Sequence, residues 1–261
     1  MTTPIRFDDG GAYDRYMGQW SQLAGHAFLD WLAPPPGLRW LDVGCGNGAF
    51  TGLILERAAP GSVDGIDLSE AQLAYARSQS GLRMVRFHHG DAMGLPFGNT
   101  IFDVAVMPLV IFFVPVPSRG VAEMVRVTAP GGLVAAYAWD MPGGGFPYDA
   151  LFAEMREMAL EVPEAPNPDA SRVDQLHELW TTAGLTSVST REISVQRTFA
   201  GFDDFWATIL GAPSVGAILR GLPPARGGDL QTRLRTKLPR AADGSITYSA
   251  RANAVKGRVP R

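Results

Sequence analysis

The feature that most constrains this chain is a short glycine-rich segment that follows an apolar run near its start. The run 38–43 leads into Gly44-Cys45-Gly46-Asn47-Gly48, and a helix-forming stretch, 49–58, comes directly after it. Glycine at alternate positions permits backbone dihedral angles closed to other residues, and a helix start presents unpaired N–H groups. The sequence therefore predicts a buried strand, a tight turn and a helix N-terminus that bind the polar groups of a nucleotide-type ligand.

Apolar runs alternate with helix-forming stretches through the first half of the chain. The expected strands are 38–43, 62–67, 83–88, 102–107 and 133–139, and the expected helices are 12–33, 49–58, 70–80 and 118–128. Such alternation is typical of parallel strands covered on both faces. With two later strands, 187–199 and 246–255, we predict an α/β fold: a doubly wound, Rossmann-like, seven-stranded and mostly parallel sheet with an N-terminal helix and an antiparallel last strand.

The second half of the chain is irregular. We expect a single domain over 1–261, with a ligand-binding core at 12–140, cap insertions at about 141–172 and 200–245, and the last strand at 246–255. The second insertion is a helical cap between the last two strands. An insertion much longer than a usual connection often carries function.

Composition narrows the classes of partner. A net charge of -3 argues against a general nucleic-acid or membrane-surface binder, and the single cysteine excludes an internal disulfide. No basic-then-apolar signal opens the sequence, and no apolar run is long enough to span a bilayer. We therefore expect a cytoplasmic protein without a metal, a monomer or homodimer.

Two classes of cofactor use a strand, a glycine turn and a helix start. The segment Gly44–Ala49 fits the dinucleotide pattern G-x-G-x-x-G/A, and Asp67 follows at about the distance of a ribose-binding acid. Asp42 and Asp91, however, place two more carboxylates at strand ends, where they would repel a diphosphate. Three carboxylates suit a cofactor with cationic and hydroxyl groups better.

The glycine segment resembles the first motif of the class I S-adenosylmethionine-dependent methyltransferases. The resemblance spans 12–140 and includes, in order, Leu41-Asp42-Val43-Gly44-Cys45-Gly46-Asn47-Gly48, Gly65-Ile66-Asp67, Gly90-Asp91-Ala92 with Leu95-Pro96-Phe97, Phe102-Asp103-Val104, and Arg126-Val127-Thr128-Ala129-Pro130-Gly131-Gly132. The chain looks most like the small-molecule methyltransferases related to ubiquinone and menaquinone biosynthesis enzymes.

This resemblance implies roles for individual residues. Asp67 would accept from both ribose hydroxyls, Leu68 would pack on the adenine, and Asp91 would accept from its exocyclic amine. Asp42 would fix the loop or the amino group of S-adenosylmethionine. The residues expected to bind this cofactor are Tyr16, Trp20, Asp42, Gly44, Cys45, Gly46, Asn47, Asp67, Leu68, Asp91, Ala92, Met93 and Met107.

The resemblance implies methyl transfer to a small, partly apolar acceptor. In-line transfer from a sulfonium needs alignment and, for some nucleophiles, removal of a proton. Asp140, at the end of the fifth expected strand, is the best-placed candidate base; His88, His89 and His177 are weaker candidates. A nicotinamide-dependent oxidoreductase and a non-catalytic S-adenosylmethionine-binding module remain alternatives.

The cap and the first helix raise two further expectations. Bulky apolar residues on 202–210 are expected to line the acceptor pocket: Phe202, Phe205, Trp206, Ile209 and Leu210. The first helix and the cap are expected to close over the cofactor about the Gly143–Gly145 run. In that closure Tyr16 and Trp20 would face the site, with Tyr13 nearer the hinge.

Overall fold

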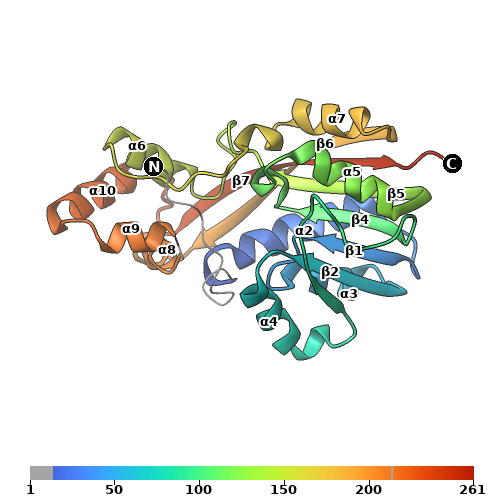
Figure 1. Ribbon diagram of the computed structural model, residues 1–261. Coiled ribbons are helices and arrows are strands. Elements are labelled where there is room, and N and C mark those ends of the chain that lie inside the picture. Colours follow the sequence, from blue (N-terminus) through green and yellow to red (C-terminus); the bar gives the residue numbers. More distant parts are fainter. Residues whose placement is uncertain (1–13, 213) are drawn as a thin grey trace.

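The computed structural model describes residues 14–212 and 214–261, and Tyr13 lies outside the described residues. Within them the chain forms a seven-stranded sheet in the order β3-β2-β1-β4-β5-β7-β6 (Figure 1). Its strands are β1 Arg39–Val43, β2 Ser62–Asp67, β3 Arg86–His89, β4 Phe102–Pro108, β5 Thr128–Trp139, β6 Thr186–Phe199 and β7 Ile246–Arg258. Strands β1 to β5 pair in parallel, while β7 is antiparallel to both β5 and β6. This confirms the expected Rossmann-like sheet.

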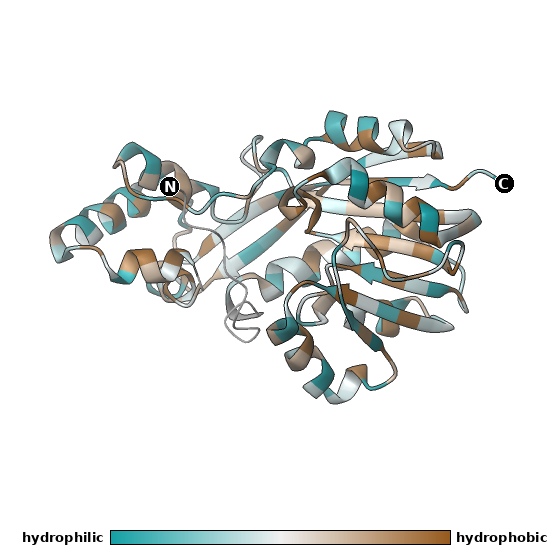
Figure 2. Cartoon of the chain, in the orientation of Figure 1, coloured by the Kyte–Doolittle hydropathy of each residue, from teal (hydrophilic) through white to brown (hydrophobic). Residues whose placement is uncertain are grey.

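Helices cover both faces of the sheet. Helix α2 packs on α3 and on the β6–β7 pair, whereas α5 and α7 pack together over β4, β5, β6 and β7. The helices are α2 Gln19–Leu32, α3 Ala49–Arg57, α4 Glu70–Ser78, α5 Pro117–Val127, α6 Asp149–Glu157, α7 Val173–Thr182, α8 Phe202–Leu210, α9 Val215–Arg220 and α10 Pro224–Lys237. In Figure 2 apolar residues, in brown, recur along the strands between white and teal ones, and the helices likewise alternate between apolar and hydrophilic residues.

Element boundaries differ from the expectation at three places. The first helix opens as a π-helix over Asp14–Gly18 before α2 begins. Strand β3 starts at Arg86, because a short 3-10 turn, Ser80–Leu82, separates it from α4. Strand β5 starts at Thr128 and passes through a proline and two glycines. The pairing of β4 with β5 shifts register there, and such an irregularity tolerates proline.

The cap forms one helical layer from two separate insertions. Helices α6, α8, α9 and α10 lie together beyond one end of the sheet, reached by the long β6–β7 hairpin (Figure 1). Glu154 of α6 is nearly inaccessible, and its carboxylate lies 3.1 Å from the Lys237 ammonium of α10. Arg233 of α10 also approaches Glu154, at 3.7 Å. These ion pairs join the segment after β5 to the segment between β6 and β7.

The glycine run after β5 is a tight turn tied to β7. The Gly143 N–H donates to the Asp140 carboxylate, and the Gly145 N–H donates to the Asp140 carbonyl at 2.8 Å. The Gly145 carbonyl in turn accepts from the Arg251 N–H at 2.9 Å. These hydrogen bonds would have to break for the run to act as a hinge, so its geometry does not favour the expected joint. No helix in the described residues is long and apolar enough to cross a membrane.

Candidate functional site

A cavity of about 420 Å³ lies at the carboxyl ends of β1, β2 and β4. This is where ligands bind in open α/β sheets. Its walls come from the glycine loop, the loops after β2, β3 and β4, and one side of α2. The described residues that line it are Ser21, Asp42, Gly44, Cys45, Gly46, Asn47, Ala49, Phe50, Ile66, Asp67, Leu68, Ser69, Gln72, Gly90, Asp91, Ala92, Pro108, Leu109, Val110, Phe113, Val114, Pro115 and Tyr137.

The glycine loop owes its shape to close packing against the loop after β4. Gly44 has φ +75°, and a Cβ added there would come 2.4 Å from a methyl group of Val110. A side chain at this position would therefore be strained and would collide with the cavity wall. Asn47 ends the loop by accepting from the Ala49 N–H at 3.1 Å, at the start of α3.

Asp67 connects the glycine loop to the start of α4. Its carboxylate accepts from the Gly46 N–H at 2.9 Å and from the Ser69 N–H at 2.8 Å. Burial raises the Asp67 pKa, and the two backbone hydrogen bonds oppose that shift. Ser69 itself caps α4 through the Gln72 N–H. The carboxylate is therefore fixed in orientation at the cavity wall, with lone pairs remaining for a ligand.

Asp42 is a fully buried carboxylate on the cavity wall. Its Oδ2 accepts from the Thr51 hydroxyl at 2.6 Å, whereas its Oδ1 has no hydrogen-bond partner among the described residues. Burial raises the Asp42 pKa to about 7. A buried, half-satisfied carboxylate favours a cationic or hydrogen-bond-donating ligand group beside it.

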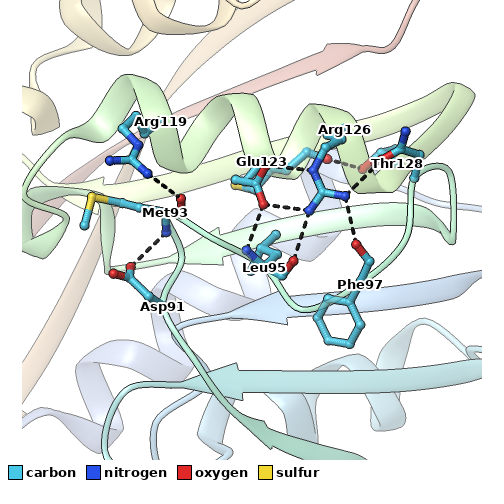
Figure 3. Close-up of polar contacts among 10 residues, drawn as sticks. Asp91, Met93, Leu95, Phe97, Arg119, Glu123, Arg126 and Thr128 are labelled. Atoms are coloured by element: carbon cyan, nitrogen blue, oxygen red, sulfur yellow. Dashed lines mark hydrogen bonds and ion pairs between the residues drawn. The ribbon is translucent and has the colours of Figure 1, made fainter.

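Asp91 is the second residue of the loop after β3, and its carboxylate accepts from the Met93 N–H at 2.8 Å (Figure 3). Ala92 also lines the cavity, but Met93 does not. Leu68, from the loop after β2, is 62% exposed and lies at the cavity rim. Asp91 therefore joins Asp42 and Asp67 around one cavity, and no cationic side chain is among the described residues that line it.

Three residues expected at the cofactor lie in the core instead. Trp20 is inaccessible, and its indole N–H donates to the Tyr148 hydroxyl at 3.3 Å. The ring of Tyr16 stacks on that of Tyr148 at 4.4 Å. Met107 is also inaccessible, and the cavity wall begins at the next residue, Pro108. The aromatic stripe on the first helix therefore faces the core, and these geometries do not favour contact with a ligand in the cavity.

The expected catalytic base is held in an ion pair. Arg251, on β7, donates to the Asp140 carboxylate at 2.6 Å, and Asp140 does not line the cavity. His88 is hydrogen-bonded to Asp64 at 2.8 Å, and His89 to the Leu68 carbonyl at 3.0 Å. His177 is exposed on α7. None of these four side chains lies on the cavity wall, and three of them are hydrogen-bonded to other groups of the chain.

The bulky apolar residues of α8 also lie away from the cavity wall. Phe205 and Ile209 are buried, and the Phe205 ring lies 6.0 Å from that of Tyr148. Phe202 stacks on Trp206 within the same helix. Neither these residues nor Leu210 are among those that line the cavity. Helix α8 uses its apolar face to attach the cap to the rest of the fold, and the expected acceptor contact is not found there.

Several cavity residues escaped the sequence analysis. Ser21 lies next to Trp20, is buried, and has a hydroxyl without a hydrogen-bond partner in the described part of the chain. The segment after β4 contributes an apolar wall, 109–110 and 113–115, which continues from Pro108, a residue expected beside the methionine part of the cofactor. The second group could have been found from the rule that ligands bind beyond the carboxyl ends of parallel strands. The place of Ser21 at the cavity could not be predicted in the same way, because helical periodicity identifies only the apolar face of a helix.

Comparison with known proteins agrees with this geometry. Residues 41–136 match a family described as a methyltransferase domain. The chain is 34% identical over 125 residues to a malonyl-[acyl-carrier protein] O-methyltransferase from Pectobacterium atrosepticum, covering 48% of this chain and 47% of that protein. It is 31% identical over 160 residues to a ubiquinone/menaquinone biosynthesis C-methyltransferase from Roseobacter denitrificans, covering 60% and 55%. The chain thus spans about half the length of these curated relatives.

A solved structure supports the fold. Phosphoethanolamine N-methyltransferase 2 from Haemonchus contortus, in complex with S-adenosyl-L-methionine, superposes with a TM-score of 0.59 at 19% identity, covering 96% of this chain and 56% of that one. The matched residues 41–136 hold the glycine loop and all three cavity carboxylates. Residues 41–136 therefore belong to the class I S-adenosylmethionine-dependent methyltransferase family.

Proposed function

We propose that this chain is a methyltransferase that binds S-adenosylmethionine in the cavity and transfers its methyl group to a small, partly apolar acceptor. The observation that carries the proposal is the convergence of Asp42, Asp67 and Asp91 on one cavity beside the glycine loop. S-adenosylmethionine has a sulfonium, an ammonium and two ribose hydroxyls, which are groups that carboxylates bind well. The family match over 41–136 supports the same activity.

Each carboxylate has a distinct group to bind. Asp67 is oriented by the Gly46 and Ser69 N–H groups, so it offers preplaced acceptors to the ribose hydroxyls. The Oδ1 of Asp42, which has no partner among the residues that the structure describes, suits the ammonium of the methionine part. Asp91 would accept from the exocyclic amine of the adenine, and the exposed Leu68 would cover the ring. These contacts distribute the cofactor along the ends of β1, β2 and β3.

The remaining wall indicates the character of the acceptor. Besides Tyr137, it consists of apolar residues at the end of β4 and in the segment that follows: Pro108, Leu109, Val110, Phe113, Val114 and Pro115. An apolar wall favours an acceptor with apolar surface and excludes water from the reacting atoms. The described lining holds no histidine, and its three carboxylates are the groups assigned above to the cofactor. The protein's main contribution to in-line methyl transfer would then be alignment.

Two other functions remain to be separated from this one. A nicotinamide-dependent oxidoreductase would place a diphosphate near Asp42 and Asp91, where like charges repel it. A non-catalytic binding module would hold S-adenosylmethionine without transferring the methyl group. No observation in the cavity favours either function over methyl transfer.

Calorimetry and isotope transfer together test the proposal. The protein is titrated with S-adenosylmethionine, S-adenosylhomocysteine and NADH, and then incubated with methyl-tritiated S-adenosylmethionine and a fractionated metabolite extract. The proposal expects binding of the first two ligands and label in an organic-soluble product. Preferential binding of NADH would support the oxidoreductase, whereas cofactor binding without label in any fraction would support the non-catalytic module.

A further inference from the structure

The loop that carries Asp91 has little internal structure to hold it in place. Residues 90–101, all of them described, form neither helix nor strand between β3 and β4. Buried backbone groups need hydrogen-bond partners wherever the chain runs. Within this loop, the Asp91 carbonyl accepts from the Gly94 N–H and the Asp91 carboxylate from the Met93 N–H. Beyond Gly94 the loop takes its partners largely from a neighbouring helix.

Arg126, near the end of α5, supplies much of what the loop lacks. Its guanidinium donates to the Leu95 carbonyl at 3.0 Å and to the Phe97 carbonyl at 2.8 Å (Figure 3). A third acceptor, the side-chain oxygen of Asn99, lies at 3.0 Å. The guanidinium also donates to both carboxylate oxygens of Glu123, at 2.7 and 2.6 Å. These acceptors match the five N–H donors of a guanidinium, which a lysine cannot reproduce.

Glu123, one turn earlier on α5, completes the attachment. Its carboxylate accepts from the Leu95 N–H at 2.8 Å while paired with Arg126. The Arg126 guanidinium, through its hydrogen bonds, holds the Glu123 pKa below its usual range. Arg119, on the same helix, donates to the Met93 carbonyl at 3.4 Å. Helix α5 is thus hydrogen-bonded to successive backbone groups of the loop, from Met93 to Phe97. These groups come directly after Asp91 and Ala92, the two loop residues that line the cavity with Gly90 before them.

We propose that Arg126 and Glu123 are positioning residues that set the preference of the cavity for adenine, by holding the 91–97 loop so that Asp91 faces the purine edge. The inference rests on the proposed function, since it assumes an S-adenosyl ligand. Neither residue lines the cavity, so they act through the loop. Loosening the loop frees Asp91 to move away from the exocyclic amine, while the ribose contact of Asp67 is retained.

The test compares two ligands that differ only along the purine edge, at C6 and at the adjoining N1, which bears a proton in the inosyl compound. S-adenosylhomocysteine carries the amine, whereas S-inosylhomocysteine carries a carbonyl oxygen, which Asp91 would repel. Dissociation constants for both are measured by calorimetry on wild type, Arg126→Lys, Glu123→Gln and Asp91→Asn. The matched control is Arg39→Lys. Arg39 also forms a two-point pair with a carboxylate, Asp103, and lies at the opposite end of the strands from the cavity.

The inference expects Arg126→Lys to weaken S-adenosylhomocysteine binding roughly 5–20-fold, as for one or two lost hydrogen bonds. Binding of S-inosylhomocysteine should change little, so the ratio of the two constants falls toward that of Asp91→Asn. Glu123→Gln should give a smaller fall, because it keeps an acceptor for Leu95. Arg39→Lys should leave the ratio at the wild-type value even if its melting temperature drops.

Several outcomes would overturn the inference. An unchanged ratio in both α5 variants, or an equal weakening of both ligands, would mean that Arg126 and Glu123 contribute only to stability. A fall in the ratio for Arg39→Lys would mean that the ratio reports general destabilisation. If wild type binds S-adenosylhomocysteine but does not discriminate, Asp91 does not read the amine. If wild type binds neither ligand, the proposed function itself fails.

Discussion

The sequence predicts a functional role for both the glycine loop and the helical cap, but the two differ in the structure: the loop lines a cavity, whereas the apolar side chains of the cap pack in the core. The end of β1 and the glycine loop after it present polar groups to a cavity, and one oxygen of Asp42 has no partner among the described residues. The cap turns its aromatic side chains inward, so that Phe205 packs on Tyr148 and Phe202 on Trp206. A buried polar group without a hydrogen-bond partner indicates a binding site, whereas apolar side chains packed against one another indicate a structural role. The comparison predicts that the two regions fail differently when mutated.

Phe205→Ala should have the largest effect, and on stability rather than binding. Phe205 is 1% exposed and contacts three aromatic rings: Tyr148 and Phe199 from two other segments, and Phe202 within its own helix. Truncating a buried phenylalanine costs about 3–5 kcal/mol. Chemical denaturation should show this loss, while the affinity of the remaining folded protein for S-adenosylmethionine stays near wild type. A large fall in affinity at unchanged stability would instead place the cap at the ligand.

Asp67→Ala should instead lower the affinity for S-adenosylmethionine more than it lowers stability. The change removes the charged acceptor for the ribose hydroxyls and also releases the Gly46 and Ser69 N–H groups. We expect S-adenosylmethionine binding to weaken by about 1.5–3 kcal/mol, measured by calorimetry. Asp103→Ala, which breaks an ion pair at the far end of the sheet, serves as the control. Equal losses of affinity in the two variants would contradict the assignment.

The pH dependence of binding should expose Asp42. Its pKa is raised to about 7 by burial, so the proton is retained in the folded protein well above the usual range. Asp42 therefore contributes stability that is present below pH 3.8 and lost as the pH rises through about 7. Binding of a cationic group needs the ionised form, so affinity should rise roughly 10-fold from pH 6 to pH 8. Asp42→Asn should flatten this profile; a profile identical to wild type would assign the titration to another group.

Ser21→Ala tests the smallest contribution. The Ser21 hydroxyl lines the cavity, is buried, and has no partner among residues 14–212 and 214–261. If it donates to the cofactor, its loss should weaken binding by about 1 kcal/mol, or roughly 5-fold. Removing a hydroxyl that has no partner should leave the unbound protein equally stable or slightly more so. Calorimetry and thermal denaturation of the same samples separate the two effects.

Closure over the cofactor remains a prediction that hydrogen exchange can test. The first helix packs through Trp20 and Tyr16 onto Tyr148, which follows the glycine turn. Amide exchange in the described residues 14–25 should slow when S-adenosylmethionine binds if the helix closes over it. Equal exchange with and without the ligand would mean that the helix is fixed core. The structure favours the second result for Trp20 because that side chain is already inaccessible.

The sequence by itself determined the parts of this protein that depend on neighbouring residues. Alternating apolar runs and helices predicted the sheet, and the acids at the strand ends predicted three carboxylates that the fold gathers around one cavity. This worked because the carboxyl ends of parallel strands meet at one edge. Position along a strand was therefore enough to place Asp42, Asp67 and Asp91 together.

Only the tertiary structure decided roles that depend on distant partners. Asp140 could be a base or an ion-pair member, and Arg251, more than a hundred residues away, makes it the second. Trp20 and Ser21 are adjacent on one helix, yet only Ser21 lines the cavity. The rotation of that helix follows from the groups packed against it, among them Tyr148, which accepts from the Trp20 indole. Periodicity identifies an apolar face but not what covers it, because the covering groups come from elsewhere in the chain.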